Sequence, residues 1–142
     1  MQSRTFRRMA VKLTKDSFDL GIVVADINAS LAFYRDFLGL PFERKTPFSK
    51  TTTLHFLTAG TGSIKLWEVT EPPAPVAKGW PLEAAPGFRY VTLSISNIDE
   101  VVAAAGDANV EVRVPVTEIM PGVKIAILAD PDGNSVELLQ AG

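Results

Sequence analysis

An internal repeat is the feature of this sequence that most constrains its fold. Residues 19–28 can be laid over residues 90–99 with a shift of 71 residues (19 to 90), so that apolar residues meet apolar residues. Residues 63–67 likewise match residues 135–139 with a shift of 72 residues (63 to 135). Two matches with nearly the same offset, at opposite ends of one unit, indicate a duplicated module.

Each copy of the repeat is predicted to contain one strand, one helix and three further strands. Residues 18–24 alternate with a period of two, which is typical of a half-buried strand. A helix is predicted over roughly residues 28–38, started by Asp26 or Asn28 and ended by Gly39. Strands are then predicted near 41–46, 51–58 and 62–70. In the second copy, strands are predicted at 88–96, 110–117, 123–129 and 134–140, with a helix near 98–105 and a hairpin turn at 130–133.

The repeat divides one domain into two modules. With 142 residues, the chain is long enough for one ordinary domain and too short for two. The first module is predicted at residues 17–70 and the second at residues 88–140. Between them, residues 71–87 contain five of the ten prolines, which favours an extended linker. Residues 1–16 are expected to form a basic, solvated arm.

Composition excludes several classes of function. The sequence has no cysteine, which excludes disulfides and thiolate sites, and its only histidine is His55, which excludes every site with two histidines. Fourteen basic and 16 acidic residues give a net charge of -2, so we do not expect a nucleic-acid partner. There is no apolar run long enough to span a membrane and no apolar region typical of a secretory signal. We therefore expect a cytoplasmic protein.

A set of short motifs resembles one known family. The motifs are Leu20-Gly-Ile-Val-Val24, Asp26, Ser30, Phe33-Tyr34, Leu38-Gly-Leu40, Asp130-Pro-Asp-Gly-Asn134 and Val136-Glu-Leu138. Over residues 17–140 this pattern resembles the vicinal oxygen chelate superfamily, which includes glyoxalases, bleomycin resistance proteins and extradiol dioxygenases. The resemblance implies an α+β fold of tandem βαβββ modules, whose sheets form an open barrel around a cleft, often in a homodimer.

Strand alternation predicts which side chains face that cleft. If Leu20, Ile22 and Val24 pack under the helix, their neighbours point the other way. The predicted cleft residues on the first and last strands of the modules are Asp19, Gly21, Val23, Ser63, Lys65, Trp67, Tyr90, Thr92, Ser94, Ser135, Glu137 and Leu139. On the other strands, Leu54 and Phe56 are expected on the helix side, which leaves Thr53, His55, Leu57 and Lys124 for the cleft.

The resemblance also identifies four positions that carry histidine or glutamate ligands in metal-binding members. These positions hold Asp19, Lys65, Tyr90 and Glu137, and only Glu137 has the usual identity. A protonated lysine has no lone pair and repels a cation. We therefore expect neither a metal nor another cofactor, and we expect Lys65 to form a charge network with Asp19 and Glu137 in place of the ion.

The candidate residues have both functional and structural interpretations. Glu137 and His55 are the candidate catalytic residues, as a general base and as a group that titrates near neutrality. Candidate ligand-binding residues are Asp19, Lys65, Trp67, Tyr90 and Thr92. Each also has a structural interpretation: Glu137 and Lys65 can form an ion pair without chemistry, and Trp67 can simply pack against the wall of the cleft.

Three functions remain open from the sequence. The first is a binding protein that holds a small organic molecule in the cleft without a metal. The second is a lyase or isomerase of a small carbonyl or oxygenated substrate that uses Glu137 with Lys65. The third, which the ligand positions favour least, is a metal-dependent glyoxalase or dioxygenase.

Overall fold

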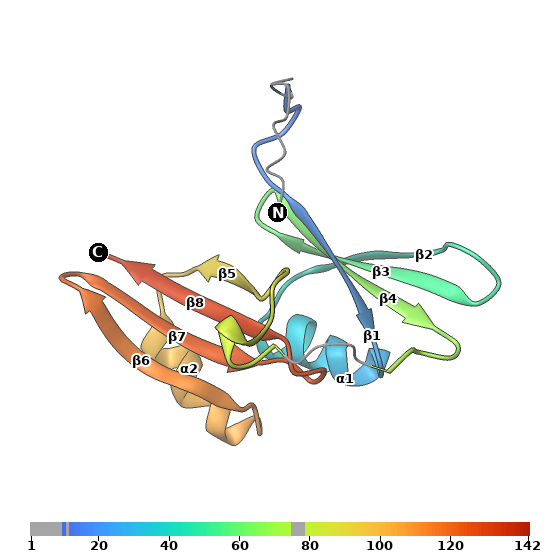
Figure 1. Cartoon of the computed structure of the whole chain (residues 1–142). Coiled ribbons are helices and arrows are strands. Elements are labelled where there is room, and N and C mark those ends of the chain that lie inside the picture. The colour runs from blue at the N-terminus through green and yellow to red at the C-terminus, as the bar shows by residue number, and fades with distance from the viewer. Residues whose placement is uncertain (1–9, 11, 75–78) are drawn as a thin grey trace, which may run out of the picture.

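The computed structural model describes residues 10, 12–74 and 79–142, which form two four-stranded sheets and their helices (Figure 1). The strands of the first sheet are β1 (Asp19–Val24), β2 (Phe42–Pro47), β3 (Thr52–Ala59) and β4 (Gly62–Val69). Those of the second sheet are β5 (Tyr90–Ser94), β6 (Val112–Met120), β7 (Val123–Ala129) and β8 (Ser135–Ala141). Every predicted strand is present.

The two sheets have the same topology. Their strand orders are β1-β4-β3-β2 and β5-β8-β7-β6, and in each sheet the first strand runs parallel to the last. The remaining neighbours are antiparallel. This equivalence confirms the α+β fold of tandem βαβββ modules. The two sheets are separate and do not close into one barrel.

The helix of the first module follows β1 after a two-residue turn. It comprises α1 (Ile27–Leu31) and continues as the π-helical segment η1 (Ala32–Phe37). Asp26 caps its start, since one carboxylate oxygen accepts the N–H groups of Asn28 and Ala29 at 2.9 and 3.2 Å. Gly39 follows the helix with a φ of +73°, which glycine adopts without strain.

The helix of the second module, α2 (Ile98–Asp107), begins differently. Asn97 occupies its N-cap position, but the Asn97 side chain does not accept a hydrogen bond from the helix backbone. Gln140 on β8 supplies that acceptor instead, because its side-chain oxygen receives the N–H of Ile98 at 2.8 Å. Asp99 and Glu100 lie in the first turn, where carboxylates interact favourably with the helix dipole.

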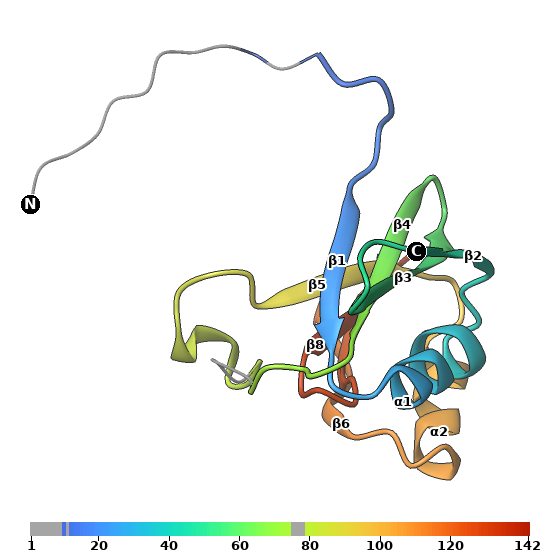
Figure 2. The ribbon, with the colours of Figure 1, turned by 90° about the vertical axis from the view of Figure 1, so that its right-hand side faces the viewer.

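One hydrophobic core joins the two modules. It takes side chains from the helices and from the helix-facing side of both sheets: Val24, Leu31, Phe33, Tyr34, Leu57, Ile64, Leu66, Ile98, Ala105, Ala126, Leu128, Val136 and Leu138. Both helices lie on one side of the molecule, at the right in Figure 2. We call the opposite side of each sheet its outer face.

Two hydrogen bonds link the first helix and the turn before it to the second module. The Tyr34 hydroxyl donates to a carboxylate oxygen of Asp130 at 2.6 Å, and the backbone N–H of Ala25 donates to Asp132 at 3.1 Å. Asp130 opens the predicted turn, where its other oxygen accepts the N–H groups of Asp132 and Asn134. Gly133 has a φ of +83°, so the turn needs glycine there.

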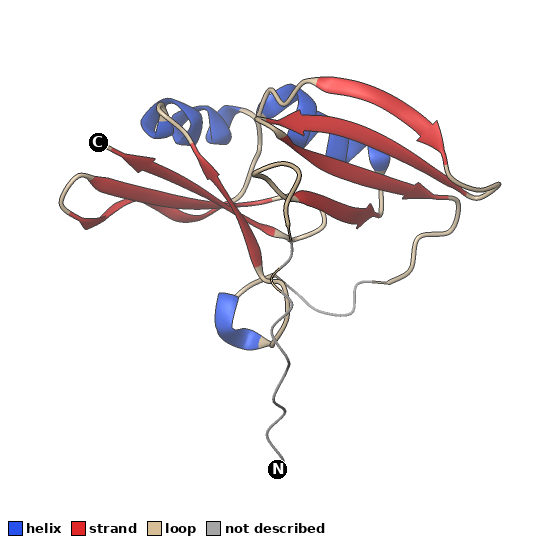
Figure 3. Cartoon of the chain, turned by 90° about the horizontal axis from the view of Figure 1, so that it is seen from above, coloured by secondary structure: helices blue, strands red, loops and turns tan. Residues whose placement is uncertain are grey.

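The proline-rich linker packs against the second module. Residues 75–78 and most of the predicted basic arm lie outside the described residues. The linker was expected to contain no helix, yet it includes a 3₁₀ turn, η2 (Leu82–Ala84), which is separate from α1 and α2 in Figure 3. Arg89 donates hydrogen bonds to the carbonyls of Pro81 and Leu82, and these bonds hold the turn. Among the described residues, no helix has the length and apolar character needed to cross a membrane.

Candidate functional site

The outer face of the first sheet carries the predicted residues of β1 and β4. Strand pairing places Asp19 beside Ser63, Gly21 beside Lys65 and Val23 beside Trp67. Their neighbours Val24, Ile64 and Leu66 are buried in the core. On the second sheet, Val136 and Leu138 are buried, which leaves Glu137 with Tyr90 and Thr92 on the outer face. The prediction of sides is therefore confirmed for these four strands.

The prediction of sides is wrong for β3. His55 pairs with Leu66, and Leu57 pairs with Ile64, so both lie on the helix-facing side. Leu54 pairs with Trp67 and Phe56 with Lys65, so they lie on the outer face. The same pairing moves Thr53, opposite Glu68, to the helix-facing side. Both sides of β3 carry apolar side chains, and the pattern alone cannot choose between two registers that differ by one residue.

Lys124 on β7 is also on the side opposite to the one predicted. It pairs with Gln140, on the same side as the core residue Ala126. Its ammonium group lies 3.2 Å from a carboxylate oxygen of Asp99 on α2. Because β7 is almost continuously apolar beyond Lys124, its sequence has no alternation that would reveal the buried side.

His55 belongs to the packed interior of the first module. The residue is 6% exposed, and its Nε2 lies 2.9 Å from a carboxylate oxygen of Glu68. Its ring packs edge-on against Phe42 at a centroid distance of 6.3 Å. A catalytic role for His55 depended on its facing the cleft, and it lies on the other side of the sheet from Lys65 and Trp67. We do not include His55 in the candidate site.

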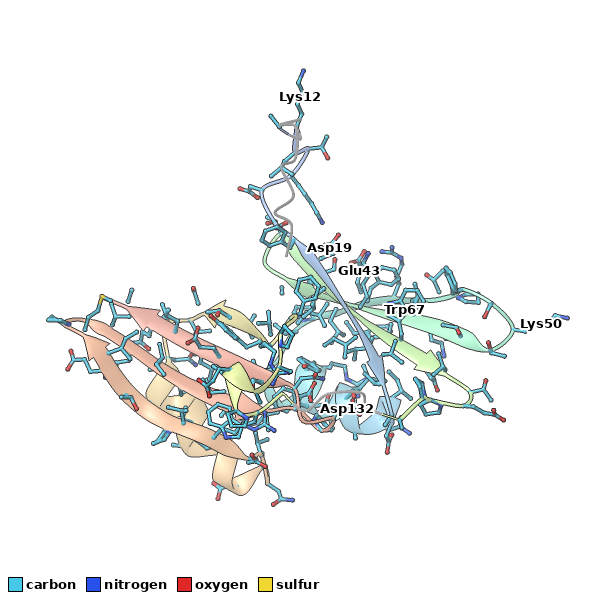
Figure 4. The ribbon with its side chains drawn as sticks, viewed as in Figure 1. Lys12, Asp19, Glu43, Lys50, Trp67 and Asp132 are labelled. Carbon is cyan, nitrogen blue, oxygen red and sulfur yellow. The ribbon has the colours of Figure 1, made fainter. Side chains whose placement is uncertain are left out.

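An aromatic pair occupies the outer face of the first sheet. The indole of Trp67 lies over Gly21, where an added Cβ would be 3.3 Å from the indole nitrogen. The ring of Phe48, which precedes β3, lies 5.1 Å from that of Trp67 between centroids. Figure 4 labels Trp67 and Asp19 on this sheet. Phe48 was not predicted to belong to the site, because it lies in a turn where no periodic pattern applies.

Two cations flank Phe56 on the same face. The Arg44 guanidinium lies 4.0 Å from the centre of the Phe56 ring, and the Lys65 ammonium lies 5.9 Å from it. Both distances suit a cation–π contact. Arg44 also pairs with its neighbour Glu43, which neutralises its charge. Arg44 was not predicted to belong to the site, since β2 is exposed along its whole length and shows no alternation.

Asp19 is held at the edge of this face as a carboxylate. One of its oxygens accepts a hydrogen bond from the Lys15 ammonium at 2.8 Å and from the backbone N–H of Ser63 at 3.0 Å. The hydrogen bond from Lys15 holds the pKa of Asp19 below its usual value, and the charge of Lys65 acts in the same direction. Asp19 is therefore ionised and already paired.

On the second sheet, the structure brings Thr92 and Glu137 together. The Thr92 hydroxyl donates to a carboxylate oxygen of Glu137 at 2.7 Å. Tyr90 lies on the same face and is 54% exposed. Within the described part of the chain, no carboxylate forms an ion pair with Lys65 at 4.0 Å or less. The predicted charge network is therefore wrong for one chain, because Lys65 forms an ion pair neither with Asp19, which pairs with Lys15, nor with Glu137.

A groove of about 430 Å³ separates the neighbouring edges of the two sheets. Its walls come from β1, β5 and the turn after β7, and include Gly21, Val23, Tyr34, Tyr90 and Asp132. Of the candidate catalytic and ligand-binding residues, Tyr90 alone lines it, although Gly21, Val23 and Ser135 of the predicted cleft residues do so as well. The groove adjoins the aromatic pair, because Gly21 lines the groove and also lies beneath the Trp67 indole.

The residues at the four expected ligand positions do not fit a transition metal. Asp19 is engaged by an ammonium and a backbone N–H, and Lys65 brings a second positive charge beside it. Glu137 lies on the other sheet. Across residues 12–74 and 79–142, no three histidine, cysteine, aspartate or glutamate side chains are grouped so that they could hold a metal ion. The donor groups at these positions therefore do not match those that a transition metal needs.

Tandem βαβββ modules with an open outer face define the glyoxalase-like class of proteins. Residues 17–138 match the model of the Glyoxalase/Bleomycin resistance protein/Dioxygenase superfamily. The chain therefore belongs to this superfamily, as the sequence motifs predicted. No curated protein matches the sequence closely enough to be informative.

Solved structures support the same fold. A glyoxalase family protein from Bacillus cereus superposes with a TM-score of 0.79 at 17% identity, covering 95% of this chain and 99% of its own. The trypanothione-dependent glyoxalase I of Leishmania major superposes with a TM-score of 0.70 at 23% identity, covering 89% of this chain and 87% of its own. Lactoylglutathione lyase from Agrobacterium tumefaciens superposes with a TM-score of 0.64 at 23% identity, covering 91% of this chain and 96% of its own. At these identities the similarity establishes the fold alone.

Proposed function

We propose that this protein binds a small organic molecule on the outer faces of its sheets, without a metal, as a glyoxalase/bleomycin-resistance-like binding protein. The observation that carries the proposal is the side chain of Lys65. It stands beside Asp19 at a position where metal-binding relatives are expected to hold their ion, and it supplies a fixed positive charge there. Lys65, Trp67 and Asp19 on the first sheet, with Tyr90, Thr92 and Glu137 on the second, form the proposed site.

Exposed apolar side chains support a binding role for these faces. Val23 is 51% exposed, Phe48 is 65% exposed and Tyr90 is 54% exposed, and all three lie beside the groove or the aromatic pair. Large apolar side chains that gather on one surface commonly mark a ligand or protein contact. The Ser135 hydroxyl donates a 2.6 Å hydrogen bond to the carbonyl of Gly79, which holds the linker against the start of β8.

We also propose that the protein is a cytoplasmic homodimer. Both outer faces belong to one chain but lie on separate sheets, and β1 and β5 each leave one edge unpaired. A second copy would cover unpaired edges, which otherwise favour aggregation.

Thermal denaturation in the presence of a library of small metabolites and drugs tests the proposed function. A ligand that binds only the folded protein raises the midpoint, and the stabilisation grows with the logarithm of the ligand concentration relative to the dissociation constant. We expect a chemically related subset of compounds to raise the midpoint, and the double variant Lys65→Met/Trp67→Ala to lose the response. If no compound stabilises the wild type, or if the double variant responds equally, the proposal is wrong.

An enzymatic function is a second candidate, and the contact between Thr92 and Glu137 favours it. The hydroxyl of Thr92 holds one carboxylate oxygen of Glu137 at 2.7 Å, which leaves the other oxygen to take a proton from a bound substrate. A lyase or isomerase would use this base with Lys65 to stabilise a developing oxyanion. If an identified ligand is converted to product, Glu137→Gln should abolish turnover and leave affinity unchanged.

A further inference from the structure

We infer that the ligand is a planar aromatic anion, an arylcarboxylate, whose ring stacks on Trp67 and whose acid group pairs with Lys65. This inference rests on the proposed function, because it names the class of molecule that the outer face of the first sheet recognises. The ring subsite consists of Gly21, Phe48 and Trp67. The anion subsite consists of Lys65, with Arg44 and Phe56 beside it.

The ring subsite is shaped for a flat group. Trp67 lies over Gly21, and a Cβ at position 21 would come within 3.3 Å of the indole nitrogen, so the absence of a side chain lets the indole lie close to the sheet. Phe48 meets the indole at an interplanar angle of 57° and a centroid distance of 5.1 Å. Phe48 is 65% exposed, so the pair is open to solvent on one side. A planar ring can add to this pair at the stacking distances that aromatic side chains prefer.

The anion subsite has a local charge opposite to that of the whole chain. The protein carries a net charge of -2. On this face, however, Asp19 is paired with Lys15, and Glu43 is paired with Arg44. Lys65 forms no ion pair of its own among the described residues. It therefore contributes an excess positive charge, and its partly buried position makes that charge more effective than one in open water.

The spacing between the two subsites sets the size of the ligand. Lys65 and Trp67 are two residues apart on β4 and share its outer face. Alternate residues of a strand are separated by roughly 6.6 Å. Because the two backbone positions are this close, we expect a ring stacked on Trp67 to bring a carboxylate, attached directly or through one carbon, to the Lys65 side chain. Bicyclic or substituted monocyclic arylcarboxylates meet this requirement.

Isothermal titration calorimetry with three probes of one shape tests the inference. The probes are 2-naphthoate, the neutral 2-naphthylmethanol and the cationic 2-naphthylmethylammonium. We expect 2-naphthoate to bind the wild type about tenfold more tightly than the neutral probe, because a hydrogen bond to a charged group contributes that much. Lys65→Met should remove this preference, and Lys65→Arg should retain it. Lys45→Met is the matched control, because Lys45 is exposed on the same sheet but pairs with His55 on the helix-facing side.

Each outcome bears on the inference separately from the proposed function. If the neutral or cationic probe binds as tightly as 2-naphthoate, the anion preference is wrong while small-molecule binding stands. If Lys45→Met weakens 2-naphthoate as much as Lys65→Met does, the anion subsite is wrong. If none of the three probes binds at millimolar concentration, the inference is wrong. The library experiment then decides whether the proposed function fails with it.

Discussion

The hydroxyl of Tyr34 donates a 2.6 Å hydrogen bond to the carboxylate of Asp130, and this contact fastens the first helix of one module to the turn of the other. Tyr34 is 1% exposed and Asp130 is 4% exposed. Burial raises the pKa of the Tyr34 phenol far above its usual value, and the charge of Asp130 adds to this effect. The phenol is therefore a permanent donor to a buried acceptor.

Replacing Tyr34 with phenylalanine should lower the free energy of unfolding by about 1–3 kcal/mol, because a buried carboxylate loses a hydrogen-bond donor while the ring is kept. Asn134 still donates to the same oxygen at 2.9 Å, so the loss is partial. Urea denaturation measures the change. Tyr90→Phe is the control, because Tyr90 is half exposed and its hydroxyl should contribute little. Equal effects of the two substitutions would contradict the importance of the buried contact.

Asp132 should make stability depend on pH. Burial raises the pKa of Asp132 above its usual value, and the charge of Asp130 acts in the same direction, although the N–H of Ala25 opposes it. The folded state therefore disfavours ionised Asp132. Protonated Asp132 therefore contributes favourably to the free energy of unfolding. This contribution is complete below the ordinary carboxyl pKa of about 4 and is lost as the pH rises through the raised pKa.

Asp132→Asn keeps an acceptor for Ala25 and removes the charge. We expect this variant to melt at a higher temperature than the wild type at pH 7, and we expect the difference to shrink at pH values near 4. Scanning calorimetry at the two pH values measures it. Glu71→Gln provides the same change of charge at an exposed position. A lower melting temperature for Asp132→Asn at pH 7 would show that the carboxylate is stabilising instead.

Two glycine substitutions distinguish an effect on ligand affinity from an effect on the free energy of unfolding. Gly21→Ala places a methyl group 3.3 Å from the Trp67 indole and should weaken the binding of an aromatic ligand roughly two- to tenfold, the range expected for one aromatic contact. Gly106→Ala, in α2, meets no atom within 4 Å and should raise the free energy of unfolding by about 0.5–1 kcal/mol. Calorimetric titration and urea denaturation of both variants provide the readouts. If Gly21→Ala binds like the wild type, Trp67 is not the ring subsite.

His55 should affect stability and not ligand binding. His55→Ala removes a buried ring and its 2.9 Å contact with Glu68, and should cost about 1–3 kcal/mol of stability. The ring lies on the helix-facing side of β3 and shares no contact with the proposed ligand. The affinity for 2-naphthoate should therefore stay within roughly twofold of the wild-type value, because substitutions at sites with no shared partners act almost independently. A much larger loss of affinity would mean that His55 reaches the ligand after all.

Much of the fold followed from the repeat, because a duplicated unit fixes the type and order of its elements. Side-chain direction was predictable on β1, where polar and apolar residues alternate, and on β4, whose partners follow from β1. It was not predictable on β3, because Leu54 and Phe56 are apolar yet lie on the outer face. The Arg44 guanidinium covers Phe56 there, and a contact between neighbouring strands leaves no signal in the pattern of either one.

The candidate site was predictable only where family positions identified it. Lys65, Asp19 and Glu137 stood out because they replace or keep expected ligands. Phe48 was missed because it lies between strands, and its contact with Trp67 depends on the turn that follows β2. The separation of Lys65 from Glu137 within one chain was missed as well, because the sequence pattern carries no information on how two modules sit relative to each other.

The proposed function requires that the Lys65 ammonium takes the place of a metal ion. The most direct test measures the metal content of the purified, dialysed protein by inductively coupled plasma mass spectrometry, together with thermal stabilisation by a bound ligand before and after treatment with EDTA. We expect no stoichiometric transition metal and an unchanged response to the ligand. One tightly held metal ion per chain, with ligand stabilisation lost on its removal, would show that Lys65 does not replace the ion.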